Sequence, residues 1–117
     1  MKPYVLTLLG LLGLGGALAA PAQDPSNDST RGKAVFQLWC YPCHKRLQPG
    51  DMPVAGTSSL QRKYNGAEPA ALEDRTDLVA AYIKTVVRHG TKSMPASRKT
   101  EISDADLDAL CAYLTKK

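Results

Sequence analysis

The stretch Cys40-Tyr41-Pro42-Cys43-His44 decides how the rest of this 117-residue chain is interpreted. A C-x-x-C-H run is typical of a covalent haem attachment site. In such a site two thiols form thioether bonds to the porphyrin, and the adjacent histidine is an axial ligand of the iron. The motif therefore predicts that Cys40 and Cys43 bind one haem c and that His44 coordinates its iron.

Three other interpretations of the motif fit the sequence less well. A thioredoxin-like redox site would lie within a strand–helix–strand pattern, and no such pattern surrounds Cys40. A zinc site would need a second pair of ligands, and the remaining candidates, Cys111 and His89, do not form one. A disulfide between the two motif cysteines would not require a histidine after them. We therefore expect haem attachment.

The first 22 residues are similar to an export signal. Lys2 gives a positive start, an apolar stretch rich in Leu and Gly follows, and small residues offer cleavage after Ala19 or after Ala22. The apolar stretch is short for an uncleaved membrane anchor, so no stable membrane span is expected after cleavage. Because bacteria attach c-type haem outside the cytoplasm, residues 1–22 are predicted to be a signal peptide that directs the chain to the periplasm.

The mature chain is predicted to be one small domain. Removal of 22 of the 117 residues leaves 95, enough for a limited hydrophobic core to which haem would contribute. Residues 23–29, rich in Asp, Pro, Ser and Asn, are expected to be a flexible leader. Residues 30–117 are expected to be the folded domain.

The apolar periodicity predicts an all-α fold, with no strand and no internal repeat. The first helix is expected to begin at Ser29 or Thr30 and to continue into Cys40. An irregular stretch over residues 42–56 follows, and then a short helix over residues 60–64.

Two longer helices are expected in the second half of the chain. Residues 76–89 carry one apolar stripe, with Asp77 in the first turn and Gly90 as a left-handed cap after the last. Ser103 opens the final helix in a pattern resembling a capping box. In that helix Cys111 shares the spacing of three leucines, so it is expected to be a small buried side chain rather than a reactive thiol.

A second axial ligand for the iron is sought among Met52, Met94 and His89. Met52 follows His44 by eight residues, a span of roughly 26–29 Å when fully extended. That span leaves little slack for the chain to pass around the haem edge. Met94 comes after a complete helix, and Pro95 would keep its loop extended. Met/His ligation is typical of electron-transfer haem proteins, so Met94 is predicted to be the distal ligand.

With C-x-x-C-H near the start of the mature chain and Met94 towards its end, the sequence resembles a class I, monohaem c-type cytochrome. The resemblance implies a cytochrome c fold, in which a small helical domain wraps around one covalent haem. It implies an electron carrier that is not itself an enzyme. It also implies that Gly32 and Phe36 of the first helix pack against Leu110 and Tyr113 of the last.

A narrower likeness rests on four runs, Arg75-Thr76-Asp77-Leu78, Val87-Arg88-His89-Gly90, Met94-Pro95 and Thr100 to Leu114. They are similar to the cytochrome subunits of 4-cresol and eugenol hydroxylase-type flavocytochromes, in which a flavin passes single electrons to haem. The likeness implies a flavoprotein dehydrogenase as donor and a respiratory acceptor. The same runs are common in free carriers, so the choice between free carrier and haem subunit stays open. The alternative function is a haem enzyme or sensor with a labile distal ligand that binds small molecules or peroxide.

Three further side chains, Tyr64, Arg62 and Arg88, are within possible reach of the haem propionates, or else pack on the surface. Pro53 is a candidate carbonyl partner for the ring N–H of His44, and the sequence leaves this open.

The distribution of charge predicts the kind of partner. The chain carries a formal charge of +4, and its acids gather at residues 68–77 and 101–108. The exposed haem edge is therefore expected in a positive field, with the acids on the far side, and such a field steers docking to an acidic partner surface. The alternative is a basic surface that serves solubility. Nucleic-acid binding is not expected, because the basic residues have no interleaved aromatics. The cations in question are Lys45, Arg46, Lys84, Arg88, Lys92, Arg98 and Lys99.

Overall fold

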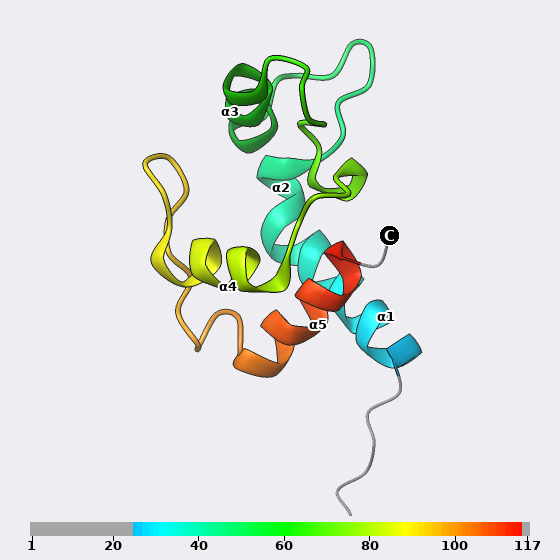
Figure 1. Ribbon diagram of the computed structural model, residues 1–117, viewed down its shortest axis with the longest axis vertical. Helices are drawn as coiled ribbons and strands as arrows, with labels where there is room; N and C mark the ends of the chain where they lie inside the picture. Colours follow the sequence, from blue (N-terminus) through cyan, green and yellow to red (C-terminus); the bar gives the residue numbers. More distant parts are fainter. Residues whose placement is uncertain (1–24, 116–117) are drawn as a thin grey trace, which may run out of the picture.

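The computed structural model describes residues 25–115, and every regular element in that range is helical (Figure 1). This confirms the predicted all-α class. The signal peptide expected at residues 1–22 lies outside the described residues. In chain order the elements are α1 (Pro25–Val35), the π-helix η1 (Phe36–Cys40), α2 (Tyr41–His44), α3 (Ala55–Tyr64), the 3₁₀ turn η2 (Leu72–Asp74), α4 (Ala80–His89) and α5 (Asp104–Leu114).

The crossing of α1 and α5 forms one side of the core (Figure 1). Gly32 allows the close approach, because a Cβ there would stand 2.0 Å from the carbonyl oxygen of Ala109 and 2.7 Å from the Cβ of Tyr113. Phe36 is fully buried, and its ring centroid lies 5.8 Å from that of Tyr113. Leu110 is also fully buried. The helix contact implied by the resemblance is therefore confirmed.

The remaining core comes from α4, α5 and the loop between them. Cys111 is buried there, and its Sγ lies 3.7 Å from the carbonyl oxygen of Ala80. Burial raises the pKa of the Cys111 thiol, which keeps it protonated. The prediction that Cys111 is buried is confirmed. Together with the α1 and η1 residues Val35, Phe36 and Cys40, these elements form one core cluster, whose other members are Ile83, Val87, Ile102, Leu107, Leu110 and Leu114.

The first helix begins earlier than expected. It starts at Pro25, so the expected start at Ser29 or Thr30 is wrong and residues 25–29 are helical rather than a flexible leader. Proline is well suited to the first position of a helix, where its missing N–H is not needed. Asp28 in the first turn is favourable to the helix dipole. The chain remains helical through η1 and α2, which brings Cys40 into the core.

The helix expected over residues 60–64 is longer than predicted. It begins at Ala55, which shortens the irregular stretch expected over residues 42–56. Thr57 lies inside α3, and its buried hydroxyl donates to the carbonyl of Lys45 at 2.7 Å. This bond ties α3 to the chain that follows His44.

The helix expected over residues 76–89 begins only at Ala80. Asp77 pairs with Arg75 instead of occupying the first turn, and Val79 is extended. Gly90 ends α4 with φ +70° and ψ −174°, so its φ is positive, but it is not the left-handed cap that was predicted. α5 begins as expected, because Ser103 Oγ accepts from the backbone N–H of Asp106 at 3.1 Å.

Candidate haem-binding site

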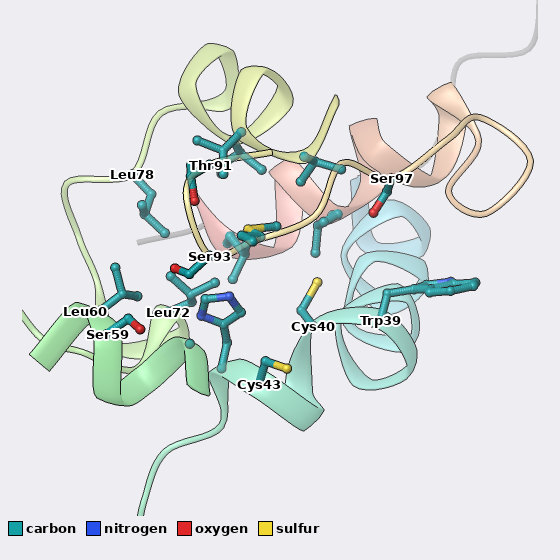
Figure 2. Close-up of a pocket in the computed structure, with 18 of the residues that line it drawn as sticks. Trp39, Cys40, Cys43, Ser59, Leu60, Leu72, Leu78, Thr91, Ser93 and Ser97 are labelled. Carbon is teal, nitrogen blue, oxygen red and sulfur yellow. The ribbon is translucent and has the colours of Figure 1, made fainter. Parts of the chain in front are cut away.

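A largely apolar cavity of about 260 Å³ lies between the η1–α2 turn, α3, α4 and the loop that follows α4 (Figure 2). The four side chains predicted from the sequence, Cys40, Cys43, His44 and Met94, all line it. Met94 is partly buried against the core. These residues come from segments fifty positions apart, and the fold brings them to one space.

The two alternative ligands lie outside this cavity. Met52 is 81% exposed and does not line it. His89 is exposed at the end of α4, and its Nδ1 lies 3.0 Å from the carbonyl oxygen of Thr85. The geometry therefore separates candidates that the local sequence could not distinguish.

Both cysteines of the motif are free thiols beside the cavity. Figure 2 shows Cys40 and Cys43 rising from the helical turn on one side, with Thr91 and Ser93 on the loop opposite. Burial, followed by the charge of Cys43, raises the pKa of Cys40 to about 11. The Cys40 thiol is therefore protonated at neutral pH, and the pair is not joined as a disulfide.

His44 is the last residue of α2, and Gly56 of α3 packs directly on its ring. A Cβ at Gly56 would stand 2.6 Å from Cε1 and 2.7 Å from Nδ1 of that ring. The buried Nδ1 has no hydrogen-bond partner among the described residues, so Pro53 is not a partner for it. Burial lowers the pKa of His44, which favours the neutral imidazole that a metal requires.

The loop carrying Met94 is fixed to the end of α4. Thr91 N–H donates to the carbonyl of Met94 at 2.8 Å, and Ser97 N–H donates to the carbonyl of Val87 at 2.8 Å. A Cβ at Gly90 would stand 2.6 Å from the carbonyl oxygen of Met94, so this turn requires glycine. Arg88 donates to the carbonyl of Ser97 at 3.2 Å. These bonds hold the thioether-bearing loop in place.

Two of the three side chains considered for the propionates, Arg88 and Arg62, do not line the cavity. Arg88 also pairs with Asp104, and Arg62 is exposed. Tyr64 does line the cavity, with Arg75 stacked over its ring. Sequence reasoning missed Arg75 as a cavity residue. An arginine set between Leu72 and Leu78 is the signal that could have found it.

The expected separation of charge is wrong. The acids of residues 101–108 do not lie apart from the cations near Met94, because the turn before α5 returns the chain towards α4. Ion pairs join these acids to those cations, as in Lys84–Asp108. The cations that follow the motif, Lys45 and Arg46, are also paired with acids. The pairs are Lys84–Asp108, Arg88–Asp104, Lys99–Asp104, Arg98–Glu101, Lys45–Asp51 and Arg46–Asp74.

Two free thiols, a neutral imidazole and a thioether around one apolar cavity fit a covalently bound haem, and with the helical fold they define the class of c-type cytochromes. A family model described as "Cytochrome C oxidase, cbb3-type, subunit III" matches residues 27–114, and the chain belongs to this family. No curated protein and no solved structure matches the chain.

Membership of this family confirms the cytochrome c fold and makes the chain a haem-based electron carrier with haem c as its cofactor. It also implies a redox partner. Within residues 25–115, no helix combines the length and the apolar composition needed to span a bilayer.

Proposed function

We propose that this chain is an exported, monohaem c-type cytochrome that carries single electrons in the periplasm. Cys40 and Cys43 would form the thioether bonds, and His44 and Met94 would hold the iron. The observation that carries this assignment is that all four side chains line one cavity, whereas Met52 and His89 do not.

When bound, haem c supplies a one-electron iron couple. The residues of the chain determine how that couple is used. Gly56 leaves room for the His44 ring, and the bonded turn after α4 presents Met94. A thioether is a soft ligand that raises the reduction potential. Because His44 and Met94 would both hold the iron, the site would favour electron transfer over the binding of small molecules.

The mass and spectrum of the periplasmic protein test this proposal. Export predicts that the purified mature chain lacks the signal peptide and gains the mass of one haem that survives denaturation. Colourless protein without that added mass would overturn it. A Cys43→Ser variant should retain at most a single thioether, which can be seen as a shifted band of the reduced protein.

Carbon monoxide discriminates this proposal from a haem enzyme or sensor. With Met94 bound, the reduced protein should bind carbon monoxide slowly and incompletely at neutral pH. Rapid, complete binding would favour the enzyme or sensor with a labile distal ligand.

The partners follow from two likenesses. The resemblance to flavocytochrome subunits favours a flavoprotein dehydrogenase as the electron donor. The family description names an oxidase, an enzyme that accepts electrons, and this favours an oxidase as the electron acceptor. Stopped-flow mixing with a substrate-reduced flavoprotein of the 4-cresol type tests the donor. Haem reduction no faster than in a control without flavoprotein would remove it as a donor.

A further inference from the structure

Arg75 is the one buried charged residue among those that the structure describes, with 3% of its surface exposed. It follows η2 and lines the same cavity as His44 and Met94. Leu72 and Leu78, on either side of it in sequence, also border this space (Figure 2). The charge of a buried cation beside an apolar cavity interacts strongly with any charge inside that cavity, because little water screens it.

The guanidinium of Arg75 has a fixed position. Its Nε donates to Asp77 Oδ1 at 2.8 Å, and a second nitrogen donates to Oδ2 of the same carboxylate. Its central carbon lies 4.3 Å from the centroid of the Tyr64 ring. These contacts hold the plane of the guanidinium from two directions.

The segment that carries Arg75 is fixed at both preceding residues. The hydroxyl of Tyr113 in α5 donates to Glu73. Arg46, just after α2, donates through Nε to Asp74 at 2.8 Å. The chain around Arg75 is therefore joined to two other parts of the fold, which limits how far the charge can move.

The ion pair is asymmetric in its exposure. The side chain of Arg75 is 4% exposed, whereas that of Asp77 is 42% exposed. Water therefore screens the carboxylate more than the guanidinium, and the pair leaves a net positive potential on the cavity side.

Resting on the proposed function, we propose that Arg75 raises the reduction potential of this cytochrome and that Asp77 is its positioning residue and counter-charge. Loss of one electron adds one positive charge within the cavity. A fixed cation nearby opposes that change, so it favours the reduced protein.

Potentiometric titration of two variants tests the proposal. Arg75→Gln should lower the ratio of reduced to oxidised protein at a fixed applied potential about tenfold, or about 59 mV for a one-electron couple. Asp77→Asn removes the counter-charge and should raise that ratio about threefold, or about 28 mV. If Arg75 and Asp77 had only a structural role, both substitutions would loosen the cavity and admit water, and the ratio of reduced to oxidised protein would fall in both variants. Two falls, or no change in either variant, therefore overturn the proposal.

The matched control is Arg31→Gln, which breaks another arginine–aspartate pair, away from the cavity, whose arginine side chain is 46% exposed. Its potential should stay within about twofold in ratio, and any shift should vanish in high salt, whereas the Arg75→Gln shift should persist. If Arg75→Gln does not take up haem, Asp77→Asn decides alone, since anything but a rise contradicts the proposal. A wild-type protein without a haem spectrum would instead refute the proposed function.

Discussion

At the residue scale, the site depends on how closely the backbone approaches His44. Gly56 lies in the first turn of α3, and any Cβ there would meet the imidazole and the carbonyl of Cys43. No sequence pattern indicates this, because the two residues come from different elements. The motif cysteines and His44, in contrast, are predictable, since their chemistry requires adjacent positions on one chain segment.

Gly56→Ala should destabilise the protein, although glycine to alanine in a helix is ordinarily stabilising by about 1 kcal/mol. Overpacking against the His44 ring should cost about 1–3 kcal/mol and displace the imidazole. Thermal unfolding and the haem spectrum measure both effects. Gly66→Ala is the control for overpacking. Alanine is strained there by the positive φ, but nothing lies within 4 Å of a Cβ at that position. A more stable Gly56→Ala protein with an unaltered spectrum would contradict this account.

At the element scale, the crossing of α1 and α5 supports the cavity from behind, since Leu110 and Leu114 of α5 line both the core and the cavity. The start of α5 was predicted correctly from Ser103, because the capping hydrogen bond from Asp106 N–H to Ser103 Oγ is local in sequence. The starts of α1 and α4 were mispredicted for different reasons. Pro25 was assigned to a leader on composition, and the pairing of Asp77 with Arg75 competes with its use at the helix N-terminus.

Gly32→Ala should weaken this crossing by about 1–3 kcal/mol, because its Cβ would overlap the carbonyl of Ala109 and the helices would have to separate. Urea unfolding of the haem-loaded protein measures the loss. The neighbouring exposed residue provides a control, and Lys33→Ala should change stability by at most about 0.5 kcal/mol. Equal stability of the two variants would show that α1 and α5 do not pack as described.

At the scale of the whole molecule, the distribution of charge could not be predicted from sequence. Acids and cations that are separate runs in the chain become neighbours once α5 lies beside α4, so the positive field expected at the haem edge is largely neutralised. Part of the cavity lining was equally beyond sequence reasoning, because Gly56 enters it through tertiary contacts. The all-α class was predictable because helical periodicity is local.

Charge neutralisation predicts a weak salt dependence of electron transfer to ferricyanide, a small anionic oxidant. Between 20 and 200 mM salt the rate should fall by less than about threefold, since paired surface charges produce little steering. Asp104→Asn releases Arg88 and Lys99 and should raise the rate at low salt about twofold, whereas Asp28→Asn on α1 should change it less. Stopped-flow kinetics measures these rates. A steep fall of the wild-type rate with salt would contradict this account and support a strong positive field at the haem edge.

The most direct test of the central claim is the sulfur-to-iron charge-transfer band of the oxidised protein in the far red. Met94→Ala should abolish this band while leaving the covalent haem in place. Met52→Ala, at an exposed methionine outside the cavity, should leave the band unchanged. Persistence of the band in Met94→Ala, or its loss in Met52→Ala, would contradict the assignment of Met94 as the ligand opposite His44.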